Sequence, residues 1–171
     1  MNSPEPLLTD HLSNHQLTNA LPCRIGSRSL IRNEKDEILL GQSRLLPESD
    51  QLLTWDLPGG WAQPGEEPRA ACRRTIREAF GVSVDPIDLL LLHWQPPQDG
   101  AAEEHTYVWN APRLPSRTAF QLADDEVVQA RFVPRNQLTA YVPDSVVERI
   151  DAARESLGRG RPDYLASRAA S

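Results

Sequence analysis

The amino-acid sequence predicts a single α+β domain built on a mixed β-sheet. Strand-like and helix-like segments follow one another without the strict β-α-β alternation of a doubly wound parallel sheet. The chain has 171 residues, of which 39% are hydrophobic and 25% are charged. This length and this composition are ordinary for one globular domain with its own core. We therefore expect an α+β or mixed-sheet sandwich fold.

The first elements expected along the chain are three extended segments. Residues 25–31 and 37–42 are strand-like, and turn-forming residues at 33–36 separate them. This pattern predicts a β-hairpin. Residues 54–57 form a short extended segment that ends at a Pro-Gly-Gly run.

A helix is expected to start at Glu66, Glu67 and Pro68 and to run to about Phe80. Proline is tolerated in the first turn of a helix, and acidic side chains there complement the helix macrodipole. Gly81 provides a C-terminal stop, because glycine adopts a positive φ without a Cβ clash.

The second half of the chain adds three strands and one helix. The strands are expected at residues 87–94, 105–110 and 127–133. Apolar residues at helical spacing then predict a helix that starts at Asp144 and ends before Gly158.

These segments divide the chain into three parts. Residues 1–20 are polar with scattered leucines, and we expect a mobile arm or a docking segment. Residues 21–160 form the domain. Residues 161–171 form a polar tail, and we expect the chain to be frayed from Arg159 onwards.

Charge and hydropathy argue against several functional classes. The formal net charge of −6 is unlike that of a nucleic-acid-binding surface, which needs a basic excess. A small anionic ligand needs only a local cluster of arginines or N–H groups. The longest apolar run, residues 87–92, is far shorter than the roughly 20 residues of a membrane span. With no signal-peptide pattern and two cysteines, expected to be reduced thiols, the sequence indicates a soluble cytoplasmic protein.

The most informative segment is residues 59–82, GGWAQPGEEPRAACRRTIREAFGV. It resembles the Nudix box, a loop–helix–loop that holds a divalent metal against a diphosphate. The positions that match the box in register are Gly60, Glu66, Arg74, Ile76, Glu78, Gly81 and Val82. Thr75 and Ala79 stand where the family has glutamates, so the box is degenerate.

The resemblance extends over residues 22–160. The segment TWDLPGGW is similar to the usual lead-in, and residues 122–158 are similar to the usual closing strand, short helix and C-terminal helix. The chain resembles an actinobacterial-type, single-domain member of the Nudix hydrolase family. The resemblance implies an α/β/α sandwich around a mixed β-sheet. It also implies hydrolysis of a nucleoside diphosphate linked to another moiety, with Mg²⁺ or Mn²⁺.

Helix geometry explains why such a box needs its acidic residues. Positions 75, 78 and 79 are related by steps of three and four residues, so their side chains share one face of the helix. Three glutamates there form an anionic patch that Mg²⁺ or Mn²⁺ neutralises, and such ions prefer hard oxygen ligands. In this sequence the face carries Thr75, Glu78 and Ala79, so one carboxylate remains.

The resemblance assigns roles to individual residues of the box and of one later loop. Glu78, Glu66 and the carbonyl group of Gly60 are the expected metal ligands. Glu126 precedes the strand at 127–133 and is expected to contact the metal or to act as a base. Arg74 is expected to orient Glu78 through charge-assisted hydrogen bonds, and an ordinary helix ion pair is the structural alternative.

The loop before the helix is expected to bind the substrate. Gly59 and Gly60 let the backbone approach the metal and the phosphates, because they carry no side chain. Trp61 is the favoured aromatic residue for stacking on a base. Further aromatic residues are interpreted as core, with stacking as the alternative: Trp55, Trp94, Tyr107 and Trp109.

Several other polar residues have both a functional and a structural interpretation. Loop acids either complete the metal site or are simply solvated; they are Glu103, Glu104, Asp124 and Asp125. His93 and His105 alternate with apolar neighbours and are interpreted as core or surface histidines rather than catalytic ones.

Three functions are compatible with these observations. The first is a Nudix-type hydrolase whose activity is weakened by the two replaced glutamates. The second is a non-catalytic module that binds a nucleotide or a phosphorylated metabolite. The third is an enzyme of another reaction type in specialised metabolism. In each the partner is a small phosphorylated or nucleotide ligand, and a homodimer is an open alternative to a monomer.

Overall fold

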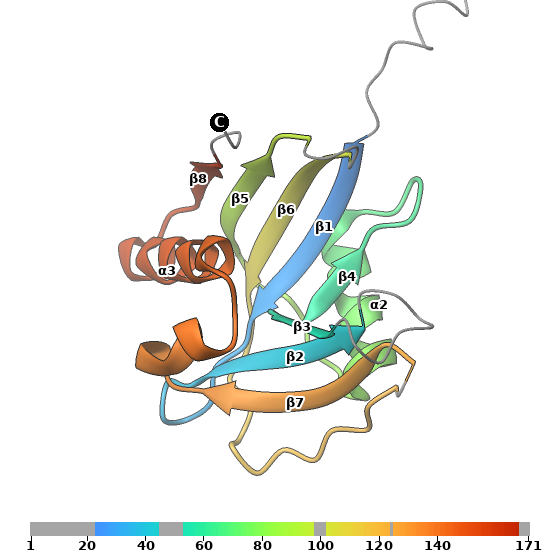
Figure 1. The fold of residues 1–171 in the computed structure, drawn as a ribbon, viewed down its shortest axis with the longest axis vertical. Helices are drawn as coiled ribbons and strands as arrows, with labels where there is room; N and C mark the ends of the chain where they lie inside the picture. The colour runs from blue at the N-terminus through green and yellow to red at the C-terminus, as the bar shows by residue number, and fades with distance from the viewer. Residues whose placement is uncertain (1–22, 45–52, 98–101, 124, 168–171) are drawn as a thin grey trace, which may run out of the picture.

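The computed structural model describes residues 23–44, 53–97, 102–123 and 125–167 (Figure 1). Its elements in chain order are β1 (Cys23–Leu30), β2 (Ile38–Arg44), β3 (Leu53–Asp56), β4 (Gly59–Trp61), α2 (Pro68–Phe80), β5 (Leu89–Gln95), β6 (Glu103–Asn110), β7 (Val127–Val133), the 3₁₀ helix η1 (Arg135–Ala140), α3 (Asp144–Arg159) and β8 (Asp163–Ala166). Within these residues the strands form a five-stranded sheet in the order β4-β1-β6-β5-β8 and a three-stranded sheet in the order β3-β2-β7. The expected arm at residues 1–20 lies outside the described residues.

The larger sheet is mixed, as the sequence predicted. β1 runs parallel to β6 and β5 runs parallel to β8, whereas β1–β4 and β5–β6 are antiparallel. The strands expected at 54–57, 87–94, 105–110 and 127–133 are all present, with ends shifted by at most two residues. The α+β class is therefore confirmed.

The expected hairpin of residues 25–31 and 37–42 is wrong in its pairing. The turn forms, because the side-chain oxygen of Asn33 accepts two backbone N–H groups at 3.0 and 2.9 Å. Beyond one bridge between Arg32 and Ile38 the two strands part, and β1 enters the larger sheet while β2 enters the smaller one. The segment is thus a corner at which the chain passes between sheets.

The helix α2 begins and ends where the sequence predicted. The carboxylate of Glu67 caps it by accepting the N–H groups of Arg69 and Ala70, each at 2.9 Å. At the other end Gly81 adopts φ 67°, and its N–H donates to the carbonyl of Arg77 at 3.1 Å.

The end of α3 differs from the expectation. The helix continues through Gly158, and Gly160 at φ 66° ends it. The polar segment expected to be frayed is also ordered in part, because β8 pairs with β5. Ser156 connects the two features: its hydroxyl oxygen lies 2.5 Å from the carbonyls of Leu90, at the start of β5, and of Arg161.

The two helices α2 and α3 cover opposite faces of the larger sheet (Figure 1). The Ser27 hydroxyl on one face donates to the carbonyl of Pro68 in α2 at 2.6 Å. His93, on the other face, accepts a hydrogen bond from Arg149 of α3 at 3.0 Å. Apolar side chains fill both layers, and the α/β/α sandwich is therefore confirmed. Neither described helix has the length and apolar character that a membrane crossing requires.

Candidate active site

The strand β4 lies tightly between β1 and α2, and its glycines permit this approach. Gly59 has φ 141°, and a Cβ atom on it would lie 2.0 Å from the carbonyl oxygen of Ser27. A Cβ atom on Gly60 would lie 2.6 Å from the Cγ2 methyl of Thr75. The chain's own atoms thus fill the space beside both glycines, so packing alone requires them at these positions.

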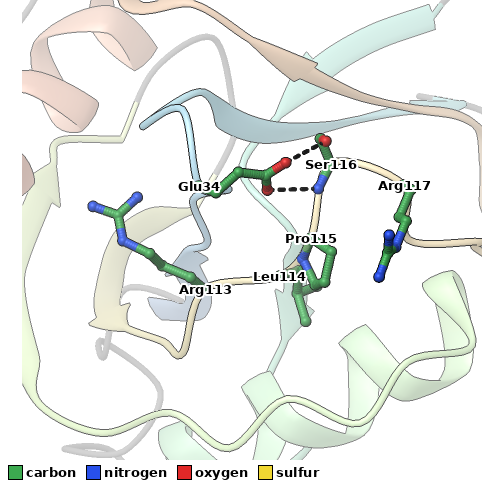
Figure 2. Close-up of a pocket in the computed structure, with 6 residues that line it drawn as sticks. All are labelled: Glu34, Arg113, Leu114, Pro115, Ser116 and Arg117. Carbon is green, nitrogen blue, oxygen red and sulfur yellow. Dashed lines mark hydrogen bonds between the residues drawn. The ribbon is translucent and has the colours of Figure 1, made fainter.

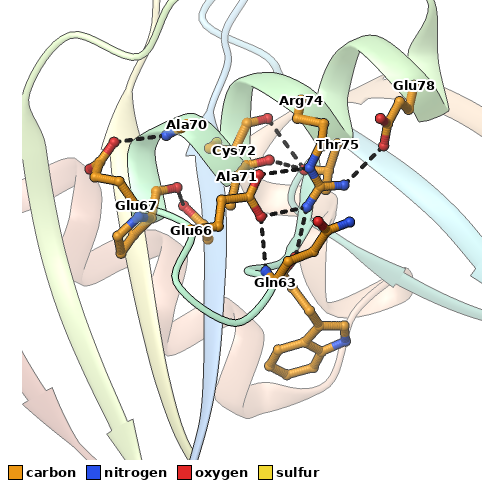
Figure 3. A network of polar contacts seen from close by, with 12 residues as sticks. Gln63, Glu66, Glu67, Ala70, Ala71, Cys72, Arg74, Thr75 and Glu78 are labelled. Atoms are coloured by element: carbon orange, nitrogen blue, oxygen red, sulfur yellow. Dashed lines mark hydrogen bonds and ion pairs between the residues drawn. The ribbon is translucent and has the colours of Figure 1, made fainter.

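Arg74 is the centre of a polar network that joins the loop to α2 (Figure 3). Its Nε and Nη2 atoms donate to the two carboxylate oxygens of Glu66 at 2.7 and 2.8 Å. Its Nη2 also donates to the carbonyl of Trp61 at 3.2 Å, and its Nη1 donates to Glu78 at 3.0 Å. The predicted orienting role of Arg74 toward Glu78 has this ion pair as its geometric basis.

Glu66 is held more firmly than Glu78. The Arg74 guanidinium and then the N–H of Gln63, at 2.8 Å, lower the pKa of Glu66 to about 2. Glu66 in turn raises the pKa of Arg74. The Glu78 side chain is 48% exposed, and one of its carboxylate oxygens forms an ion pair with Arg74 at 3.0 Å. Glu78 is therefore the box carboxylate that is better placed to meet a solvent-borne ion.

The two replaced positions of the box belong to the core. Thr75 is buried, and its hydroxyl lies 2.9 and 3.3 Å from the carbonyls of Ala71 and Cys72 in its own helix. Ala79 is 3% exposed and packs beside Phe80. Of the three positions on this face of α2, only 78 presents a carboxylate.

The loop before β7 is attached to the end of α2. The N–H groups of Gln121 and Ala123 donate to the carbonyls of Phe80 and Ala79, each at 3.0 Å. Glu126 follows this attachment and is exposed. Asp125 is exposed as well, and Asp124 lies outside the described residues.

The placement of Glu103 and Glu104 in a loop is wrong, because both belong to β6. Glu103 bonds His105 at 2.5 Å, and Glu104 accepts from the Thr106 hydroxyl at 2.9 Å.

Trp61 lies beside two arginines of β1. The guanidinium carbon of Arg24 is 3.7 Å from the ring centroid, and that of Arg28 is 5.5 Å from it. The start of β1, Trp61 and the loop through Glu66 and Glu67 line a hollow of about 670 Å³. Trp109, by contrast, is 6% exposed and belongs to the core, as predicted from the sequence.

The loop, the capped helix and the arginine network together suggest a known family. Residues 24–152 match the family model described as NUDIX domain. The chain belongs to the Nudix family. The recognition made from residues 59–82 is thereby confirmed, and the α2 segment with its preceding loop is the box of this Nudix domain.

A curated relative extends the comparison to a protein with a named activity. The 8-oxo-dGDP phosphatase NUDT18 of Mus musculus is 30% identical over 106 residues. The match covers 62% of this chain and 31% of the relative, so it spans about a third of that protein's length.

Solved structures share the fold of this Nudix domain. The MutT protein from Methanosarcina mazei Go1 has a TM-score of 0.65 at 22% identity, over 82% of this chain and 96% of that one. A UDP-X diphosphatase has a TM-score of 0.66 at 20% identity, over 85% and 68%. The NUDIX domain of Shewanella oneidensis NrtR, complexed with ADP ribose, has a TM-score of 0.61 at 18% identity, over 85% and 98%.

A second polar network lies on the α3 side of this Nudix domain, and sequence reasoning missed it. Arg149 is 4% exposed and donates to His93 at 3.0 Å, to Gln95 at 2.8 Å and to Asp56 at 3.4 Å. Arg28 donates to the same Asp56 at 3.2 Å. Burial and then the Arg149 charge lower the pKa of His93 to about 4, so this histidine is neutral at pH 7. The interpretation of His93 as a core histidine is consistent with this environment.

In a hollow near the β1–β2 corner, polar groups of the lining hydrogen-bond one another (Figure 2). The backbone N–H and the hydroxyl of Ser116 both bond the carboxylate of Glu34, at 2.8 and 2.5 Å. The hydroxyl and then the N–H groups lower the pKa of Glu34 to about 2. The Glu34 carboxylate therefore joins the β1–β2 corner to the loop at Ser116, and both of its oxygens already accept hydrogen bonds.

Proposed function

We propose that this Nudix domain hydrolyses a nucleoside diphosphate linked to another moiety. The observation that carries the proposal is the half-exposed Glu78, fixed by an arginine that also fixes Glu66 and the carbonyl of Trp61. The named activities of the relatives, an 8-oxo-dGDP phosphatase and a UDP-X diphosphatase, point to the same class of substrate.

The residues present fit a divalent cation of the hard type. Glu78 offers a carboxylate and Gly60 a main-chain carbonyl, with Glu66 close by in the same network. Mg²⁺ is commonly held by one or two carboxylates together with substrate phosphates, so a single helix carboxylate is compatible with it. When bound, Mg²⁺ or Mn²⁺ supplies charge neutralisation and a Lewis acid at the diphosphate.

The protein's own groups would then position the reactants. Arg74 keeps Glu78 and Glu66 in place through charge-assisted hydrogen bonds. Trp61 lies at the hollow, and a base would stack on the ring face that Arg24 leaves open or replace the Arg24 guanidinium. Glu126 is exposed and would accept the proton of the attacking water.

The second candidate is a binding module that retains the ligand and lacks turnover. One observation favours it: the side chains of Thr75 and Ala79 are packed into the core, so neither is available as a metal ligand. Arg74 also shares its charge between both remaining acids, which weakens their attraction for a cation.

A substrate panel separates the two functions. Purified protein is incubated with Mg²⁺ and then Mn²⁺ and with ADP-ribose, nucleoside triphosphates, dinucleoside polyphosphates or nucleotide sugars. Both product release and thermal stabilisation are recorded. The hydrolase is supported by turnover of at least one member. Thermal stabilisation by a member that is never turned over supports the binding module. If no member is turned over and no member stabilises the protein, both proposed functions are contradicted.

A further inference from the structure

Three side chains with metal-ligating atoms meet at one end of the larger sheet, where β1 and β6 begin side by side (Figure 1). In this parallel pair Cys23 lies opposite Glu103, and Ile25 lies opposite His105. Side chains two residues apart on a strand point to the same face, and so do those of opposite partners. The register therefore brings Cys23, Glu103 and His105 together on one face.

The distances are close to those of a coordination sphere. One ligand atom from each residue, namely the sulfur, a carboxylate oxygen and a ring nitrogen, lies within 4.8 Å of the other two. The His105 Nε2 and Glu103 Oε1 atoms are 2.5 Å apart. Around a tetrahedral ion with ordinary Zn–S and Zn–N bond lengths, ligand atoms are separated by about 3.3–3.8 Å. In the metal-bound form the 2.5 Å contact between Glu103 and His105 would lengthen to that spacing.

We propose that Cys23, Glu103 and His105 form a binding site for a borderline transition-metal cation such as Zn²⁺. A thiolate with an imidazole selects such ions, whereas Mg²⁺ requires oxygen ligands. Three protein ligands leave a fourth position for water. Binding displaces the thiol proton of Cys23 to solvent and moves the His105 ring proton to Nδ1, so that Nε2 can ligate.

Two features of the surroundings support a built site. The Trp94 side chain lies on the same face of the sheet as His105 and Glu103 and so borders the cluster. Trp94 lies opposite His105 on the neighbouring strand β5. Cys23 is exposed and lines the hollow beside Trp61, so an ion can reach its sulfur from solvent. The alternative is that Glu103 and His105 only pair with each other and that Cys23 lies nearby without binding an ion.

Cobalt substitution distinguishes these alternatives. Chelator-treated full-length protein is titrated with Co²⁺ and then with Zn²⁺, and absorption is recorded together with the Kd. We expect one thiolate-bound ion per chain, the ligand-field bands of tetrahedral Co²⁺ and a thiolate-to-metal charge-transfer band, all abolished by Zn²⁺. Excess Mg²⁺ should leave the spectrum unchanged.

Variants assign the ligands. Cys23→Ser should remove the charge-transfer band, and His105→Ala should weaken Kd beyond the roughly 10–100-fold seen when only an outer partner of a metal ligand is lost. Cys72→Ala is the matched control, because that thiol is fully buried in the core. The controls Cys72→Ala and Glu78→Gln should both keep the parent spectrum. An unchanged Kd in Cys23→Ser, or a parent protein that binds no Co²⁺, would overturn the proposal. Glu78→Gln also distinguishes this site from the Nudix box. If the box proves to have no catalytic activity, the Co²⁺ result is unaffected.

Discussion

Replacing Thr75 and Ala79 by glutamate restores the acidic face of α2, and the variant should be unstable unless a divalent cation is present. Ala79 is 3% exposed and packs beside Phe80 and Val127. A carboxyl group in such surroundings has its pKa raised, by about 3 units if the site stays closed. At about 1.36 kcal/mol per unit, the free energy of unfolding at pH 7 falls by about 3.5 kcal/mol, slightly less than the full amount because the raised pKa lies close to pH 7.

The second substitution adds to this cost. The Thr75 methyl group covers Gly60, so a glutamate at position 75 must turn away from β4. For a domain of this size, a loss of about 4 kcal/mol lowers Tm by about 8–16 °C. A cation that binds only the folded state raises the free energy of unfolding by about 2.7 kcal/mol when its concentration is 100 times its Kd.

The assay is a thermal melt with and without Mg²⁺ at constant ionic strength. The control is Thr75→Gln/Ala79→Gln, which has the same bulk without the charge. We expect both variants to melt below the parent and only the glutamate variant to recover in Mg²⁺. Equal Mg²⁺ dependence of the two variants would refute the assignment of this face to the metal.

Three further perturbations test other parts of the structure. Arg149→Met should lower the free energy of unfolding by about 3–5 kcal/mol in urea, because it leaves buried polar partners unsatisfied; a loss below about 1 kcal/mol would contradict the buried network. The folded pKa of Glu66, about 2, lies below its ordinary value, so its contribution to stability is complete above about pH 5 and is lost as the pH falls toward 2. Glu66→Gln should therefore flatten the acid limb of a Tm–pH curve, and an unaltered limb would count against the Arg74 network. Gly59→Ala should destabilise the fold because its φ is 141°, whereas Gly158→Ala in the open surface of α3 should stabilise it by about 0.5–1 kcal/mol in the same denaturation assay. Equal effects of the two glycine changes would refute the packing of β4.

Local chemistry made some elements predictable from sequence and left others undetermined. Proline and acidic residues at the start of α2 and Gly81 at its end act on their immediate neighbours, so both ends of the helix were predictable. The choice of strand partner is a long-range property. The turn at Asn33 was recognisable, but the pairing of β1 with β6, some 80 residues away, depends on packing that no short segment encodes.

The same distinction applies to the candidate site. Glu66, Arg74 and Glu78 lie on one loop and one helix, so their spacing alone brought them together. The network of Arg149 draws on β1, β3, β5 and α3, which no local pattern connects. One signal was available: Arg149 stands beside Ile150 in a helix whose apolar residues face the sheet, where an arginine requires buried partners.

The most direct test of the proposed function is the rate of Mg²⁺- or Mn²⁺-dependent hydrolysis of the best substrate of the panel, in the parent and in Glu78→Gln. Glu148→Gln, an exposed glutamate of α3, is the matched control. We predict that kcat falls by about 100-fold or more in Glu78→Gln, as for loss of a group that stabilises developing charge, and stays at the parent value in the control. Equal rates in Glu78→Gln and in the parent would contradict the central role of the box carboxylate.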